Sequence, residues 1–175
     1  TFEEEKGLRS AVQVGYPFVE KLLIEACLEL AETDWMEGMG DLGAAGLAAA
    51  AVEAAGRAGS GVEIDVALVP RREEGMTAYE VMLAESQERM LIVAKQGYQE
   101  KINALFSRWD IPCTPIGQVT GDGLAVARED GREGARVPVK LLTEPPRYVY
   151  QVSKPCWLRR LQALRAPPDL DARQA

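Results

Sequence analysis

The stretch 77–109, TAYEVMLAESQERMLIVAKQGYQEKINALFSRW, decides how this chain folds. It begins with Thr77, which Glu80 follows three residues later, and this capping box predicts the start of a short helix. The apolar run Arg89–Lys95 then predicts a buried strand. From Tyr98 onward, apolar residues recur at helical spacing and predict an amphipathic helix. A strand enclosed by two helices indicates a unit in which helices cover a sheet.

The segments on either side of this stretch continue the alternation of strands and helices. The elements expected before it are a strand at 11–15, a helix from Pro17 to about Thr33, a strand at 35–39, a helix at 44–57 and a strand at 62–66. After it, 114–120 and 124–128 are predicted to form a hairpin across the turn 121–123, and 136–139 a last short strand. The chain is therefore expected to have an α/β (α+β) fold, a mixed sheet covered by helices.

Length and proline content predict one domain with a tail. A chain of 175 residues can bury a core without metals or disulfides. We expect a linker at 1–10, the α/β domain at 11–143 and a proline-rich tail at 144–175 that contains one short helix. The start at Thr1 rather than Met, followed by a charged run, favours a piece of a longer protein that begins in a linker.

Composition excludes several classes of protein. The 20 basic and 27 acidic residues give a net charge of −7, which argues against nucleic-acid binding through a basic surface. The longest apolar stretch, 42–52, is about half a membrane span and is interrupted by glycines, so no membrane-spanning helix is expected. The absence of histidine excludes a Ser-His-Asp triad and a His-ligated zinc within the chain. Three widely separated cysteines without a CxxC pair favour a reducing compartment, the cytoplasm.

Two segments each join a predicted strand to the start of a helix. Val12-Gln13-Val14-Gly15 ends a strand in an amide and a glycine, and the alternative is a strand end with a solvated Gln13. In 40–46, GDLGAAG, glycines allow close backbone approach, and the free N–H groups of a helix start attract anions. Asp41 then either holds Mg²⁺ beside a phosphate or caps the helix.

A third segment, 84–90, is unusually polar for the connection between a helix and a buried strand. Glu85, Ser86 and Gln87 offer a carboxylate, a hydroxyl and an amide side by side. These groups are suited to bind a sugar or a phosphate ester, because together they both donate and accept hydrogen bonds. The alternative is a solvated loop.

Taken in order, the three segments resemble a known family. AVQVG-x-PF-x-EKLL, DLGAAGL and EEGMT-x-YE-x-ML-x-ESQERM are similar to segments of the large synthetase subunit of phosphoribosylformylglycinamidine synthase. The similarity runs from about Glu3 to about Val139. It implies an ATP-dependent ligase that converts formylglycinamide ribonucleotide to the amidine in purine biosynthesis, and a fragment that covers the first C-terminal-type α/β domain of that subunit.

The resemblance also implies the cofactors, partners and site residues. Gln13, Glu85, Ser86 and Gln87 would bind the ribonucleotide, and Asp41 would be a magnesium ligand. No catalytic residue is implied in this chain. ATP would be bound mainly by a preceding domain, so the isolated fragment is expected to be inactive. The implied partners are the remaining domains of the subunit, a glutaminase subunit and a small third subunit, without nucleic acid or membrane.

The sequence departs from the family pattern at three places: Tyr16 stands where the family usually has Asp, Gly40 where it has Gln, and Ala48–Ala50 where it has Ser or Thr. These changes make the expected site less polar. They favour an alternative function, a non-catalytic scaffold or interaction domain of the same fold. A third hypothesis is another synthetase of the superfamily, such as a hydrogenase-maturation or selenophosphate-type enzyme, and the ESQERM segment argues against it.

Overall fold

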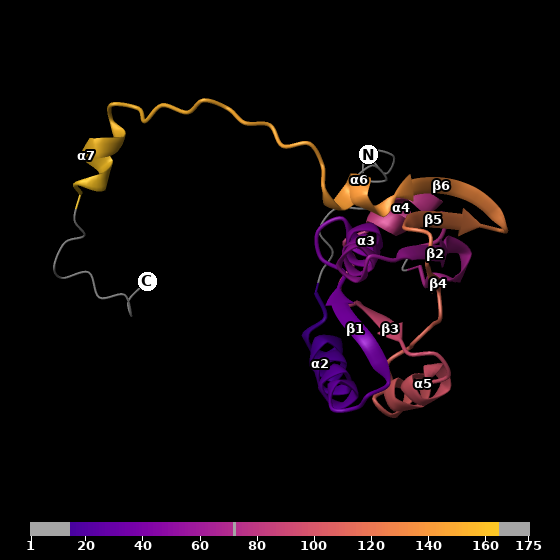
Figure 1. Ribbon diagram of the computed structural model, residues 1–175. Coiled ribbons are helices and arrows are strands. Elements are labelled where there is room, and N and C mark those ends of the chain that lie inside the picture. The colour runs from indigo at the N-terminus through magenta and orange to yellow at the C-terminus, as the bar shows by residue number, and fades with distance from the viewer. Residues whose placement is uncertain (1–14, 72, 165–175) are drawn as a thin grey trace, which may run out of the picture. The chain divides into compact units, whose positions relative to one another are not determined.

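The computed structural model describes residues 15–71 and 73–164, and their strands form two separate sheets (Figure 1). Contacts between residues divide the chain into two units, Thr1–Pro145 and Pro146–Ala175. All strands of the described residues lie in the first unit. The mixture of strands and helices confirms the predicted α/β (α+β) class.

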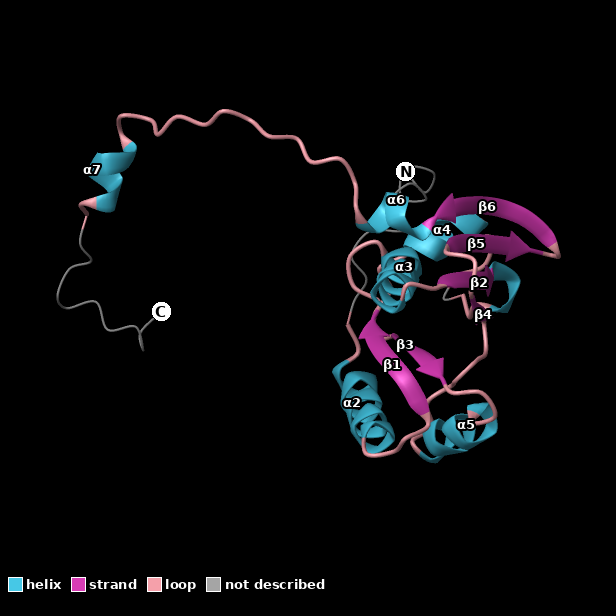
Figure 2. Ribbon diagram, viewed as in Figure 1, coloured by secondary structure: helices cyan, strands magenta, loops and turns pink. Residues whose placement is uncertain are grey.

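The smaller sheet is an antiparallel pair of strands, β1 (Met36–Asp41) and β3 (Met90–Ala94). Helices α2 (Pro17–Ala31) and α5 (Gln99–Arg108) lie next to it (Figure 2). Both helices direct their apolar sides into one core, whose buried members are Leu23, Ala26, Cys27, Leu30, Ile102, Leu105, Phe106 and Ile111. Residues of both strands pack against this core, so α2 and α5 cover one face of the sheet.

The larger sheet has the strand order β4-β2-β5-β6. Its strands are β2 (Gly61–Asp65), β4 (Gly117–Thr120), β5 (Leu124–Glu129) and β6 (Arg132–Pro138). Only β2 and β5 are parallel within this sheet. The helical elements that pack with it are α3 (Gly46–Ala58), the short 3₁₀ helix η1 (Val66–Leu68), α4 (Ala78–Leu83) and α6 (Val139–Thr143). A second core joins α3, α4, β2 and η1 through Leu47, Ala51, Ile64, Val66 and Val81.

The predicted hairpin of 114–120 with 124–128 is wrong, because β2 lies between β4 and β5. In β2, Ile64 is opposite Gly117 of β4 on one side and Ala127 of β5 on the other. The connection between β4 and β5 passes the end of β2 at Gly61, where a Cβ atom would collide with the residues of that connection. A glycine at this place lets the turn straddle β2.

Strand β6 is longer than the predicted strand 136–139, because it begins at Arg132, directly after the turn. Asp130 and Gly131 both have positive φ, 50° and 75°, and reverse the chain within two residues. The strand lies at the edge of its sheet and is largely exposed. Its polar residues therefore show none of the alternation that marks a half-buried strand.

The helix start predicted at Thr77 is confirmed. The Thr77 hydroxyl oxygen accepts from the N–H of Glu80 at 3.3 Å, and the Glu80 carboxylate accepts from the N–H of Thr77 at 2.8 Å. The strand predicted at 11–15 lies outside the described residues except for Gly15, which belongs to no strand.

In the second unit, the described residues run without regular structure to a short helix, α7 (Leu158–Gln162). The helix predicted in the tail is thus present. Among the described helices of the whole chain, none is long and apolar enough to cross a membrane.

Candidate functional site

The glycine-rich turn between β1 and α3 packs closely against the loop that follows α4. Ala45 and Gly46 adopt left-handed backbone conformations, with φ of 59° and 53°. A Cβ atom on Gly46 would overlap the carbonyl oxygen of Ala84, so this close approach requires glycine. The loop 84–89 therefore lies directly against the first turn of α3.

Loop 84–89 directs a carboxylate to this helix start. Glu85 Oε1 accepts a hydrogen bond from the N–H of Ala45, at 3.0 Å. Within the loop, Gln87 Nε2 donates to the carbonyl oxygen of Glu85 at 3.1 Å. Ser86 is buried, whereas Glu85 and Gln87 are exposed. The positive end of the helix dipole thus attracts a negative charge supplied by the protein itself, Glu85.

Arg89, the last residue of the same loop, donates hydrogen bonds to two of the loop's carbonyl groups. Its Nε donates to the carbonyl oxygen of Ser86 at 2.9 Å, and its Nη2 donates to that of Ala84 at 2.6 Å. The side chain is partly buried, and this burial lowers the pKa of the Arg89 guanidinium. The main chain of Arg89 also binds the turn before α3, because its carbonyl oxygen accepts from the N–H of Leu42 at 3.3 Å.

A small pocket of about 220 Å³ opens beside the loop. It is lined by Pro70, Arg71, Ser86, Gln87 and Arg89. Arg71 reaches it from the segment after η1 and forms an ion pair with Glu129 at 2.9 Å. Two of the five lining residues, Arg71 and Arg89, carry a guanidinium group, and Glu129 offsets the charge of Arg71.

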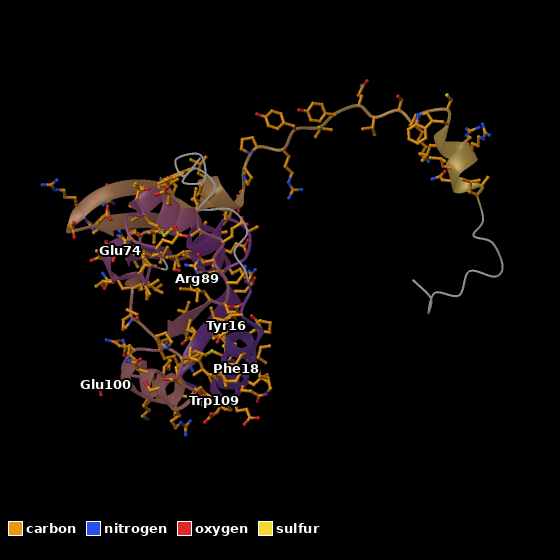
Figure 3. All side chains as sticks on the ribbon, turned by 180° about the vertical axis from the view of Figure 1, so that it is seen from behind. Tyr16, Phe18, Glu74, Arg89, Glu100 and Trp109 are labelled. Carbon is orange, nitrogen blue, oxygen red and sulfur yellow. The ribbon has the colours of Figure 1, made fainter. Side chains whose placement is uncertain are left out.

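The segment that precedes α2 comes to the same loop. The Glu88 carboxylate accepts a hydrogen bond from the N–H of Tyr16 at 2.6 Å, although the two residues are 72 positions apart. Tyr16 and Arg89 are both labelled in Figure 3. Gln13, the predicted ribonucleotide contact, lies three positions before Tyr16 and outside the described residues.

Asp41 is the last residue of β1 and lies opposite Met90 of β3. Its side chain is exposed, and one carboxylate oxygen is 2.9 Å from the position that a Cβ atom would take on Gly43. The interpretation that Asp41 caps the following helix is wrong, because the N-cap of α3 is Ala45. In the described ranges, no group of three or more His, Cys, Asp or Glu side chains could hold a metal ion.

Sequence reasoning missed two residues that organise this site, Glu88 and Arg89. Both belong to the polar run 84–90, and the presence of charge in that run was the available indication. Their roles depend on main-chain groups of other segments, which a residue pattern does not show. Together the site offers carboxylate, hydroxyl, amide and guanidinium groups from three segments, which is the chemistry that binds a sugar phosphate.

Comparison with known proteins agrees with this description. Residues 1–129 match the family model described as AIR synthase related protein, C-terminal domain. The phosphoribosylformylglycinamidine synthase subunit PurL of Moorella thermoacetica is 53% identical over 95% of this chain and 24% of its own length. This similarity over most of the chain confirms the resemblance inferred from the three segments.

Solved structures show the same fold. Thermotoga maritima PurL complexed with FGAR has a TM-score of 0.76 and 32% identity, covering 83% of this chain and 24% of that one. The structure of that protein complexed with ATP has a TM-score of 0.75 and 32% identity, with coverages of 82% and 25%. This chain therefore spans about a quarter of the length of these relatives. It belongs to the family of AIR synthase related proteins, as a C-terminal-type domain.

Proposed function

We propose that this chain is part of the synthetase subunit of phosphoribosylformylglycinamidine synthase, an ATP-dependent carbon–nitrogen ligase of purine biosynthesis. In that reaction, ATP phosphorylates the amide oxygen of formylglycinamide ribonucleotide. Ammonia then displaces the phosphate, so the oxygen leaves with it and the amidine forms. This chain contributes part of the ribonucleotide site, and residues outside it complete the catalytic site.

One observation carries this proposal, the convergence of three distant segments. The turn 41–46 touches loop 84–89 through the hydrogen bond from Ala45 to Glu85. The segment that follows Gln13 reaches the same loop through the hydrogen bond from Tyr16 to Glu88. These are the three segments that carry the resemblance to the family. Their meeting supports one shared binding site more strongly than three solvated loops.

The chemistry of the loop suits the two ends of a ribonucleotide. Glu85 uses one carboxylate oxygen for Ala45, and its other oxygen is suited to accept from ribose hydroxyls. Ser86 and Gln87 line the pocket that also contains two guanidinium groups, so they are suited to donate to the phosphate. The name of the Thermotoga maritima complex, PurL with FGAR, supports the same ligand class. Gln13 would complete the contact.

Asp41 fits the role of a magnesium ligand. Its carboxylate is exposed at the end of β1 and is not used as a helix cap. Mg²⁺ is held by one or two carboxylates together with phosphate oxygens and water, so a single carboxylate from this chain suffices. When bound, the ion would offset the negative charge of phosphate oxygens. Asp41 itself would hold the ion at the edge of the smaller sheet, beside the turn that leads into α3.

The remaining partners follow from the length of the relatives. We propose that the other domains of the subunit bind most of the ATP and contact this chain. A glutaminase subunit and a small third subunit would supply the ammonia, and the assembly would work in the cytoplasm. The alternative, a scaffold domain that binds no ribonucleotide, predicts that site substitutions leave catalysis unchanged.

The test is steady-state kinetics of the full-length synthetase with the substitution Gln87→Ala. We expect the Michaelis constant for the ribonucleotide to rise about tenfold, which corresponds to about 1.4 kcal/mol, because a hydrogen bond to a charged group contributes about 1.5–3 kcal/mol. The Michaelis constant for ATP should change little. Gln118→Ala, in the exposed edge strand β4, is the matched control. Equal constants in the Gln87 and Gln118 variants would favour the scaffold.

A second measurement tests the extent of the site. The isolated 175-residue chain, given ATP, Mg²⁺, ammonia and the ribonucleotide, should form no amidine. Turnover above background by the isolated chain would contradict the division of the site between this chain and the rest of the subunit.

A further inference from the structure

Loop 84–89 contains the three proposed substrate contacts and is short, irregular and only partly buried. Such a loop has few apolar contacts to hold one conformation, and ordering each of its residues costs about 1–2 kcal/mol in backbone entropy. Hydrogen bonds to its carbonyl oxygens therefore help to hold the loop in one conformation. Two of them, on Ala84 and Ser86, receive hydrogen bonds from the same guanidinium, that of Arg89.

Arg89 differs from the other arginines whose ion pairs the structure describes. Five other arginines each form an ion pair with a glutamate: Arg57, Arg71, Arg108, Arg128 and Arg136. Among the described residues, no carboxylate forms an ion pair with Arg89, and its side-chain Nε and Nη2 donate to main-chain carbonyls of its own loop. Burying a cation is unfavourable unless its donors are satisfied. The arrangement therefore ties the charge of Arg89 to the shape of the loop.

The two hydrogen bonds from Arg89 to Ala84 and Ser86 are called the Arg89 clamp below. The carbonyl oxygen of Ala84 connects this clamp to α3. It accepts from Arg89 on one side, and Gly46 lies against it on the other. One residue further along, Glu85 binds the N–H of Ala45. The side chains of Ser86 and Gln87 follow directly. Displacement of the Ala84 carbonyl would therefore shift the whole row of proposed contacts relative to α3.

From this geometry we infer that Arg89 is a positioning residue, which holds Glu85, Ser86 and Gln87 in the conformation that binds the ribonucleotide. The inference rests on the proposed function for its substrate, whereas the clamp itself is independent of it. A planar guanidinium serves this purpose because its Nε and Nη2 donors point in a fixed direction and reach two carbonyls at once. A lysine ammonium keeps the charge but loses this fork.

The test combines limited proteolysis and kinetics on the full-length synthetase. A glutamate-specific protease can cut the loop after Glu85 or Glu88, and cleavage after Glu32, in the exposed turn that follows α2, serves as the internal reference. In Arg89→Met and Arg89→Lys, we expect loop cleavage at least about tenfold faster than in the unchanged protein, with the reference rate unaltered. The Michaelis constant for the ribonucleotide should rise about tenfold or more, and that for ATP less than about twofold. Arg57→Met, on the exposed side of α3, should change neither.

The outcomes separate this inference from the proposed function. Unchanged loop cleavage in both Arg89 variants overturns the inference, and it does so even if ribonucleotide binding weakens, because Arg89 would then contact the ligand directly. Recovery of normal kinetics in Arg89→Lys overturns it as well, because charge alone would suffice. An unchanged ribonucleotide constant in Gln87→Ala overturns the proposed function instead, whatever the cleavage rates. If Arg89→Met does not fold, Arg89→Lys carries the test.

Discussion

Charged side chains have different partners in loop 84–89 and on strands β5 and β6. On these strands, Arg128 forms half-buried ion pairs with Glu63 of β2 and Glu133 of β6, and Arg136 forms a more exposed pair with Glu133. In the loop, Glu85 and Arg89 hydrogen-bond to main-chain groups instead. The strands have a ladder of backbone hydrogen bonds that fixes their shape, whereas the loop relies on side chains for that purpose.

This difference in partners determines where substitutions should have large effects. Exposed ion pairs typically contribute about 0–1 kcal/mol, because water screens them and ordering two long side chains costs entropy. Removing a side chain that satisfies main-chain groups exposes the full cost of those groups. We therefore expect large effects around the loop and small ones on β5 and β6, and three predictions test this contrast.

The largest effect is expected for Gly46→Ala. The new Cβ atom would overlap the Ala84 carbonyl oxygen, and alanine is strained at a φ of 53°. The two penalties together should lower the free energy of unfolding by about 3 kcal/mol. Urea unfolding of this chain measures it. Gly38→Ala is the matched control, because a Cβ atom there meets nothing within 4 Å. Similar losses in both variants would show that the contact between Gly46 and the loop is unimportant.

An intermediate effect, on activity only, is expected for Asp41→Ala. Loss of the proposed magnesium ligand should lower the activity of the full-length synthetase more than tenfold, about 1.4 kcal/mol in the barrier, with little change in melting temperature. Asp65→Ala should do the reverse, because the Asp65 carboxylate accepts from the N–H of Ala67 at 3.0 Å and caps η1. Its loss should cost about 1 kcal/mol of stability. Full activity of Asp41→Ala would remove Asp41 from the site.

The smallest effect is expected for Glu133→Gln on β6. The hydrogen bond from Arg136 lowers the pKa of Glu133 in the folded state. A lowered pKa means that the carboxylate stabilises the fold above its unfolded pKa, about 4.3, and that this contribution disappears as the pH falls through the folded value. Denaturation at pH 7 should show a slight loss in the variant, and denaturation at strongly acidic pH should show none. A larger loss in acid would reverse the assigned sign.

Local patterns predicted the parts of the fold whose causes are local. The capping box of Thr77 and Glu80 is complete within four residues, and it was predicted correctly. The β4–β5 connection was predicted incorrectly because the strand that separates them, β2, ends more than fifty residues earlier in the chain. Turn residues alone do not reveal such an insertion.

The candidate site shows the same division. Glu85, Ser86 and Gln87 were identified because a run of polar residues before a buried strand is unusual. The clamp by Arg89 was not, because it depends on the direction of two carbonyl groups. The link from Glu88 to Tyr16 was likewise hidden, since it joins segments 72 positions apart. The sequence therefore indicated candidate side chains, and the structure shows the hydrogen bonds that surround them.

The most direct test of the central proposal is a crystal structure of the full-length synthetase with bound formylglycinamide ribonucleotide. The account predicts one ligand within hydrogen-bond distance of Ser86 or Gln87, with Gln13 on the same side and Arg89 still bonded to the carbonyl oxygens of Ala84 and Ser86. A ribonucleotide bound away from loop 84–89, or Gln13 on the opposite face from that loop, would contradict it.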